Sequence, residues 1–381
     1  MIVMNKQKGS VSLFVVVFAA LLITIVTVSF IRIMVHDQEQ ATTADLSQSA
    51  YDSAQAGVED AKRALVRYQD ICSNSTTECV AVQQKINSSV CNDAVKTLED
   101  IPKTDGEIKV QQLNSANALD QAYTCVKINL NTPDYLGKMA VDDSKIIPLI
   151  GDEPFDTIKI EWFNSSDLGA KNDVDLPSSI NSLSLPKKSE WSQYTPPIIR
   201  AQIIQFGSSF SLSDFDDSED SEGTNASTVF LQPAAQGLSG SLTEISFPDF
   251  RRVSSSPMLV SCNKTVDQGT YSCSMQLKIP KTIGGVERST LFLRLSAIYN
   301  SANYKISLSN SSKPINFKAV QPEIDSTGRA NNLFRRVKTR VELTDTNYPY
   351  PDAAVDITGS FCKDFLVTDD DLDYNAGMCS Q

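Results

Sequence analysis

The chain has 381 residues, with 34 Lys and Arg against 46 Asp and Glu, which gives a net charge of −12. This acidic balance argues against nucleic-acid binding, because contacts to phosphates need a basic surface. His36 is the one histidine, so a Ser-His-Asp triad, a Cys-His pair or a histidine-based metal site would have to use it. We therefore expect no enzymatic activity. The length suffices for a sizeable core and for two or more folding units.

The first segment of the chain is apolar and long enough to cross a membrane. The 22 residues Ser10–Ile31 contain no charged side chain, and as a helix they would span about 33 Å, against about 30 Å for a bilayer core. Lysines precede this segment and Arg32 follows it. By the positive-inside rule, residues 10–33 are predicted to form a single transmembrane helix in the lipid bilayer, with the N-terminus in the cytoplasm and the rest outside.

The helical pattern continues beyond the apolar segment. The first of the 16 prolines is Pro102, and apolar or small side chains recur at intervals of three and four residues from Ala50 to Tyr68, as on one helix face. The sequence therefore predicts one helix from Ser10 to about Tyr68, about 90 Å long. Residues 34–70 would be its extracytoplasmic continuation.

Two parts of this region resemble a known family. The stretch Lys6–Gly9 (KQKG) before the apolar run resembles the leader of type IV prepilins and type II secretion pseudopilins. The stretch Asp45–Ala61 resembles the Ala/Gly/Glu-rich segment of PilX-type minor pilins. The resemblance covers under a fifth of the chain. It implies that residues 1–9 are a leader, that a membrane prepilin peptidase cleaves after Gly9, and that Ser10 becomes the first mature residue, with a methylated amine.

Within this resemblance, the fifth residue counted from Ser10 helps to distinguish a major from a minor pilin. Major pilins usually carry a glutamate there, which is thought to pair with the N-terminal amine of a neighbouring subunit; this chain has Phe14. A carboxylate in hydrocarbon is costly unless it is paired. PilX-like and GspK-type subunits commonly lack it and are placed at the filament tip. Phe14 therefore favours a minor, tip-associated subunit whose partners are other pilin or pseudopilin subunits, contacted through the helix.

All the cysteines follow the apolar segment, which fits disulfides in an oxidising outside compartment. They are Cys72, Cys79, Cys91, Cys125, Cys262, Cys273, Cys362 and Cys379. Zinc usually requires paired C-x-x-C spacing, which is not present. Isolation in sequence predicts the disulfides Cys262–Cys273 and Cys362–Cys379. Two pairings of the first four stay open: Cys72–Cys79 with Cys91–Cys125, or Cys72–Cys91 with Cys79–Cys125.

Residues 71–200 read as a mixed α/β part of the head and residues 201–381 as a β-rich part, although a single elaborated β domain is also compatible with the pattern. Short helices are predicted over Val80–Val90 and Val110–Tyr123. Alternation of apolar and polar residues predicts antiparallel strands over Tyr123–Leu130, Thr157–Phe163, Ile198–Phe206, Thr228–Leu231, Leu242–Phe247, Met258–Cys262, Tyr271–Ile279, Thr290–Tyr299, Tyr304–Leu308, Lys338–Leu343 and Ala354–Ile357. With the resemblance, the expected fold class is α+β and pilin-like: a long N-terminal helix, transmembrane in its first part, followed by a large, antiparallel β-rich, disulfide-stapled head.

The C-terminal run offers a candidate calcium site. Asp369, Asp371, Asp373 and Asn375 recur at alternate positions before Gly377. Such oxygen ligands on a loop can converge on Ca²⁺, which takes six to eight oxygens from flexible ligands. The run is not an EF-hand, because its glycine comes three positions later than in an EF-hand loop and its twelfth position is not a glutamate. The alternative is an acidic, solvent-exposed tail.

The chain has one basic cluster, formed by Arg335, Arg336, Lys338 and Arg340. On a strand, Arg336, Lys338 and Arg340 would share a face. The cluster could dock an acidic partner such as a neighbouring subunit, or it could be an ordinary solvent-exposed strand face.

The resemblance implies a minor pilin or pseudopilin that takes part in filament assembly or surface contact. Such a chain is made in the cytoplasmic membrane and then enters an extracellular filament. The alternative from another class is a single-pass surface adhesin or binding protein that never enters a filament. An anchored hydrolase would need only two carboxylates, but nothing in the sequence locates such a pair.

Overall fold

The computed structural model describes residues 9–99, 106–110, 120–141, 143–169, 171–177, 187–206, 225–236, 242–244, 257–283 and 290–343. The chain divides into two compact units. The first joins residues 1–132 to residues 321–343, and the second joins residues 133–320 to residues 344–381. Residue 200, where the sequence suggests a boundary, lies inside β6 (Ile198–Phe206) of the second unit.

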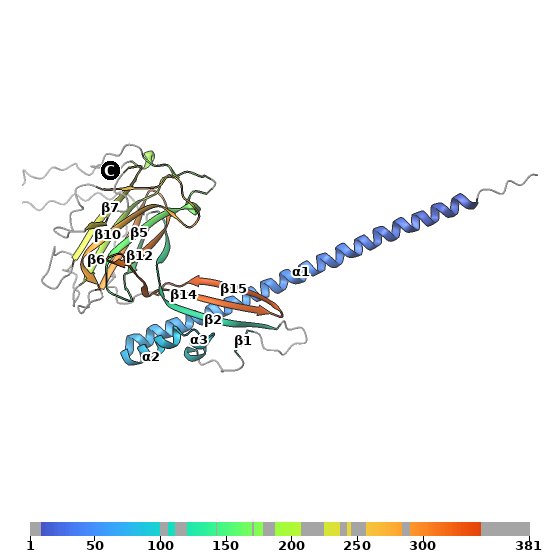
Figure 1. Cartoon of the computed structure of the whole chain (residues 1–381), viewed down its shortest axis with the longest axis horizontal. Coiled ribbons are helices and arrows are strands. Elements are labelled where there is room, and N and C mark those ends of the chain that lie inside the picture. The colour runs from blue at the N-terminus through green and yellow to red at the C-terminus, as the bar shows by residue number, and fades with distance from the viewer. Residues whose placement is uncertain are drawn as a thin grey trace, which may run out of the picture. The chain divides into compact units, whose positions relative to one another are not determined.

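The first unit is organised around one very long helix. Helix α1 runs from Gly9 to Asn74 without interruption and has 66 residues, which corresponds to about 100 Å. Figure 1 shows its first half extending away from the sheet of its own unit. The long helix predicted from the missing prolines is therefore present and ends about two turns later than predicted. Two shorter helices follow, α2 (Thr76–Ile86) and α3 (Asp93–Leu98).

Four strands complete the first unit, in the order β1-β2-β14-β15. Their bounds are β1 Ile108–Lys109, β2 Gln121–Thr132, β14 Phe317–Ala330 and β15 Leu333–Arg340, with the first four residues of β14 belonging to the second unit. Strands β14 and β15 form an antiparallel hairpin in which Ala330 pairs with Leu333. Residues 121–123 belong to β2, so the prediction of a helix reaching Tyr123 is wrong there. Tertiary pairing with β1 and β14 outweighs the local helical pattern.

The second half of α1 packs on this sheet through small side chains. Ala50, Ala54 and Ala61 are completely buried, and the Ser326 hydroxyl of β14 donates a hydrogen bond of 2.7 Å to the Ala54 carbonyl. A Cβ added at Gly328 would lie 2.2 Å from backbone atoms of α1. The glycine therefore permits an approach of helix to strand that any side chain would prevent.

The second unit contains two β-sheets. The six-stranded sheet has the order β13-β12-β5-β10-β8, with β3 also paired to β12; the five-stranded sheet has the order β4-β11-β6-β7-β9. The bounds of the first sheet are β3 Tyr135–Met139, β5 Phe155–Asn164, β8 Leu242–Glu244, β10 Tyr271–Ile283, β12 Ala302–Asn310 and β13 Lys313–Ile315. The bounds of the second are β4 Ser144–Pro148, β6 Ile198–Phe206, β7 Asn225–Ala234, β9 Met258–Ser261 and β11 Thr290–Ile298. Single turns of 3₁₀ helix occur at Ser165–Asp167 and Lys188–Glu190.

The hydrophobic core of the second unit joins the facing sides of both sheets. Alternate residues point inward, such as Ile158 and Ile160 of β5 in one sheet and Leu293 and Leu295 of β11 in the other, all with no exposed area. This alternation is the burial pattern of a sandwich of two sheets. Most pairings are antiparallel, as predicted, but β8 pairs in parallel with β10 and β9 pairs in parallel with β7.

Three disulfides lie within the described residues. The structure contains Cys262–Cys273, the pair expected from its isolation in sequence. The first four cysteines pair as Cys72–Cys79 and Cys91–Cys125, one of the two arrangements that the sequence leaves open. Cys262 and Cys273 staple two strands around the turn Asp267–Thr270. Cys362 and Cys379 lie outside the described residues.

Candidate functional site: the projecting apolar helix

The first half of α1 exposes a long apolar surface. From Leu13 to Val35, every large apolar side chain is at least 50% exposed. An exposed apolar surface of this size is rare on a soluble monomer and indicates contact with lipid or with other apolar surfaces. Among the described residues, α1 is the one helix long and apolar enough to cross a membrane.

The few polar side chains in this segment satisfy their own hydrogen bonds. The hydroxyl groups of Thr24, Thr27 and Ser29 donate to helix carbonyls three or four residues earlier, at distances of 2.7–3.1 Å. In hydrocarbon every polar group must find an internal partner, because no water is present. The part from Leu13 to Ile31, which precedes Arg32, is therefore suited to lipid.

The residues expected to take part in processing and assembly lie at the start of α1. Gly9 is the first residue of the helix, and Phe14 is 71% exposed. His36 is exposed on the same helix, one turn beyond Arg32. The rest of the proposed leader, residues 1–8, lies outside the described residues.

The candidate calcium ligands Asp369, Asp371, Asp373 and Asn375 all lie outside the described residues. Within the described part of the chain, no group of three or more His, Cys, Asp or Glu side chains is arranged to hold a metal ion.

The basic cluster lies on β15, and its charges are largely matched inside the sheet. The Arg336 guanidinium binds both carboxylate oxygens of Asp325 on β14 and lowers the pKa of that carboxyl group. Lys338 bonds Glu323 at 2.8 Å. Arg335 points the other way and donates to the Ser47 hydroxyl of α1 at 2.8 Å. The cluster therefore ties β15 to β14 and to the helix.

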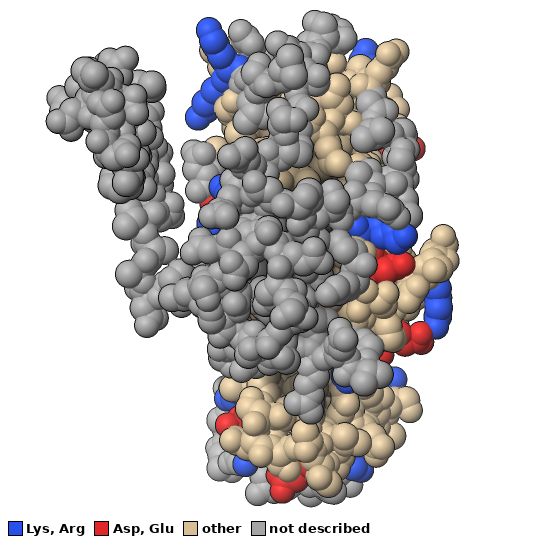
Figure 2. All heavy atoms as spheres, turned by 90° about the vertical axis from the view of Figure 1, so that its left-hand side faces the viewer, with Lys and Arg blue, Asp and Glu red and all other residues tan. Residues whose placement is uncertain are grey.

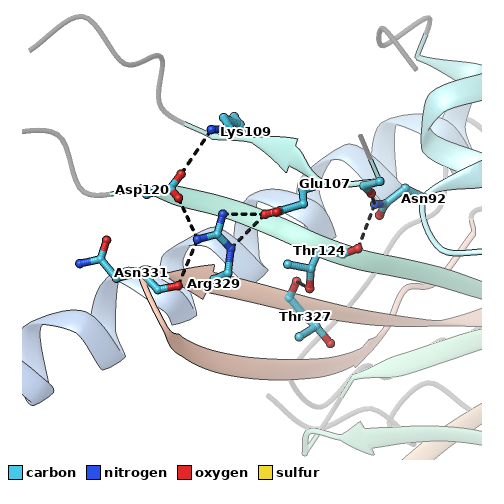
Figure 3. Close-up of polar contacts among 9 residues, drawn as sticks. Asn92, Glu107, Lys109, Asp120, Thr124, Thr327, Arg329 and Asn331 are labelled. Atoms are coloured by element: carbon cyan, nitrogen blue, oxygen red, sulfur yellow. Dashed lines mark hydrogen bonds and ion pairs between the residues drawn. The ribbon is translucent and has the colours of Figure 1, made fainter. Parts of the chain in front are cut away.

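A second polar network joins β14 to the strands at the other edge of this sheet. Figure 3 shows Arg329 of β14 pointing toward Glu107 and Asp120, which directly precede β1 and β2. Its guanidinium bonds Glu107 at 2.7 Å and Asp120 at 2.9 Å, while Lys109 also contacts Asp120 at 3.5 Å. The hydrogen bond from Arg329 lowers the pKa of Asp120. Sequence reasoning missed this network, because its members are up to 222 residues apart.

Asn92 covers the part of the β2 edge that β1 leaves unpaired. Its backbone and side chain exchange two hydrogen bonds with Val126, at 2.9 and 2.7 Å, and its amide also donates to Gly106 and Thr124 (Figure 3). The residue is completely buried and has φ +64°, a left-handed conformation that asparagine tolerates better than most side chains. An edge covered in this way resists pairing with foreign strands.

The first unit also has a shallow hollow of about 320 Å³. Polar and charged side chains from the end of α2, from β2 and from β14 line it, among them Asn87, Lys127, Asn129, Glu323 and Asp325. Both carboxylates already pair with β15 cations. In the face seen in Figure 2, cationic and acidic side chains of the described residues are interspersed and form no single extended patch.

Comparison with known proteins identified no relative of this chain. No protein-family profile, no curated protein and no solved structure matches the chain. Its function must therefore be argued from its own residues and geometry.

Proposed function

We propose that the chain is a minor type IV pilin or pseudopilin, located at or near the filament tip, that takes part in filament assembly or surface contact. The observation that carries this proposal is the division of α1. Its first half is apolar and exposed. Its second half packs on a β-sheet through buried alanines, with Gly328 of the sheet close against the helix backbone. One continuous helix thus joins a lipid-compatible anchor to a folded head.

The exposed half of α1 supports a role in assembly. In the membrane, lipid covers its apolar side chains. Outside the membrane they need other apolar helices, because exposure to water would be strongly unfavourable. A filament core of packed helices supplies that cover. Phe14, in place of the glutamate of major pilins, supports a minor position without a neighbour above it.

The disulfides support a head outside the cytoplasm. Three are formed among the described residues, and no described cysteine is free. Such bonds persist in oxidising compartments. Together with the lysines before the apolar segment, this favours a topology with the N-terminus inside and the head outside.

The proposal is tested by the intact mass of the chain extracted from membranes of cells with an active prepilin peptidase. The expected product lacks Met1–Gly9 and begins at Ser10, with a methyl group on its amine. A Gly9→Glu variant, which changes only the residue before the cleavage site, is the control and should stay uncleaved. A wild-type chain that still begins at Met1 would refute the pilin assignment and favour the anchored adhesin.

A further inference from the structure

The hollow of the first unit lies on the face of its sheet that is turned away from α1. On β14 the Ser326 hydroxyl bonds α1, and on β2 Val126 lies against Gly57 of the helix. Neighbouring side chains of a strand point to opposite faces. The outward side chains that line the hollow are therefore Lys127 and Asn129 on β2 and Glu323 and Asp325 on β14. Its volume of about 320 Å³ is within the range of small-ligand sites.

The two carboxylates of the hollow are held in fixed positions by β15. Arg336 donates to both oxygens of Asp325, and Lys338 donates to Oε1 of Glu323 at 2.8 Å. An ionised carboxylate accepts about four hydrogen bonds, so both groups keep free acceptor capacity. Because each has a cation beside it, they present oriented acceptors without an unpaired negative charge.

Two amide groups of the hollow supply oriented donors. The Oδ1 atom of Asn87, at the end of α2, accepts a hydrogen bond of 3.2 Å from the Leu130 N–H. The Oδ1 atom of Asn129 accepts one of 3.2 Å from the Asn131 N–H. With the oxygens engaged, the NH₂ groups of Asn87 and Asn129 each have two N–H donors and no partner among the described residues.

The charges around the hollow favour a neutral ligand. The pKa of Asp325 is lowered mainly by its hydrogen bonds from Arg336 and also by the nearby charge of Lys127. An anion would meet the carboxylates of Glu323 and Asp325, and a cation would meet Lys127 and carboxylates that already have partners. A hydroxyl group is both a donor and an acceptor. Vicinal hydroxyls can therefore bond amide donors and carboxylate acceptors at the same time.

We propose that this hollow binds a neutral hexose. Asn87 and Asn129 donate to its hydroxyl groups, and Glu323 and Asp325 accept from them. Groups that are already held in place lose little conformational entropy on binding, but a shallow hollow covers only part of a small ligand, so we expect a millimolar dissociation constant. All the lining residues belong to the first unit. The inference does not depend on whether the chain enters a filament.

The test uses the full-length chain in a non-ionic detergent without a sugar headgroup and measures binding of glucose, galactose and mannose by saturation-transfer difference NMR. Wild type should bind at least one of these hexoses in a saturable manner. The amino sugar and the uronic acid derived from that hexose should each bind more weakly. No binding of any of the three hexoses, or equal or tighter binding of a charged analogue, would overturn the proposal.

The variant Asn129→Asp keeps the acceptor for the Asn131 N–H and replaces the free NH₂ donor by a second acceptor oxygen. It should weaken hexose binding about fivefold or more, as the loss of a hydrogen bond does. The matched control is Asn332→Asp, which adds the same charge at an exposed asparagine of the same unit outside the hollow and should bind like wild type.

A second variant, Asn129→Ala, removes the donor without adding a charge and should also weaken binding. The thermal midpoint of each variant, compared with wild type, shows that the first unit is folded. Equal losses in Asn129→Asp and Asn332→Asp, or unchanged binding by Asn129→Ala, would overturn the assignment of the hexose to this hollow.

Discussion

The contact between α1 and β14 leads to a strong prediction for Gly328→Ala. The added Cβ would lie 2.2 Å from both Ala50 O and Ala54 N, and 2.8 Å from the carbonyl carbon of Ser53. Ordinary contacts begin at 3.4 Å. The helix and the strand would therefore have to separate by about 1.2 Å at this point. The contacting helix atoms belong to the backbone and cannot rotate away as a side chain could.

The cost of this change can be estimated from the same contacts. Overpacking a well-filled site costs about 1–3 kcal/mol. Separation also stretches the buried 2.7 Å hydrogen bond from Ser326 to Ala54, which contributes about 1 kcal/mol. We expect Gly328→Ala to lower the free energy of unfolding of the first unit by about 2–4 kcal/mol.

Urea unfolding of the full-length chain in non-ionic detergent can separate the two units. Both tryptophans, Trp162 and Trp191, lie in the second unit, so their fluorescence reports on the sandwich, whereas circular dichroism at 222 nm reports mainly on α1. Gly328→Ala should shift the circular dichroism transition and leave the fluorescence transition in place.

Gly269→Ala is the matched control, the same substitution in the other unit. Gly269 has φ +84° and open space around it, so alanine there adds backbone strain of about 1–2 kcal/mol without a clash. It should shift the fluorescence transition alone. A stability of Gly328→Ala within about 0.5 kcal/mol of wild type would refute the close-packing argument.

Three further predictions follow from the disulfide, the anchor and the Arg329 network. Replacing Cys262 and Cys273 together by serine should cost the second unit about 2–3 kcal/mol, measured by tryptophan fluorescence in urea, because the unfolded chain loses a constraint; an unchanged midpoint would contradict this. Leu22→Arg should release part of the chain from carbonate-washed membranes, since arginine at a helix centre costs about 2.5–3.5 kcal/mol; full retention would argue against a membrane span. The pKa of Asp120 is lowered in the fold by Arg329, so its stabilisation is complete above the unfolded value of about 3.9 and is lost as the pH falls through the folded value. Thermal midpoints between pH 6 and 2 should therefore decline more steeply in wild type than in Arg329→Gln, and parallel profiles would contradict the role of this ion pair.

Much of the fold could be predicted from local pattern. The absence of proline before Pro102 predicts the long helix, because proline would interrupt its hydrogen bonds. Alternating apolar residues locate most strands of the sandwich, and Ile198–Phe206 is observed with the predicted bounds. The turn at Asp267–Gly269 and the adjacent disulfide also follow from short-range sequence.

Strand β14 could not be predicted in this way. Pro322 and Gly328 interrupt its pattern, and both residues usually disfavour a strand. Gly328 is tolerated because α1 packs directly over it. This reason is not visible in the sequence, since the contacting residue Ala54 is more than 270 positions away. The same distance explains why the two-unit division, which joins residues 321–343 to the N-terminal part, does not follow from local composition.

The candidate site was predictable in part. The apolar run predicts the exposed half of α1 without any tertiary information. The network around Arg329 depends on strand register, which alternation alone does not fix between distant strands. The calcium ligands proposed at Asp369–Asn375 stay a prediction.

The most direct test of the account is the content of filaments sheared from cells that express this chain. Mass spectrometry should detect the chain there in small amounts, beginning at Ser10, and Gly9→Glu should remove it from the filaments while it stays in the membrane. Filaments that lack the chain, with wild-type protein retained in the membrane and beginning at Met1, would contradict the central claim.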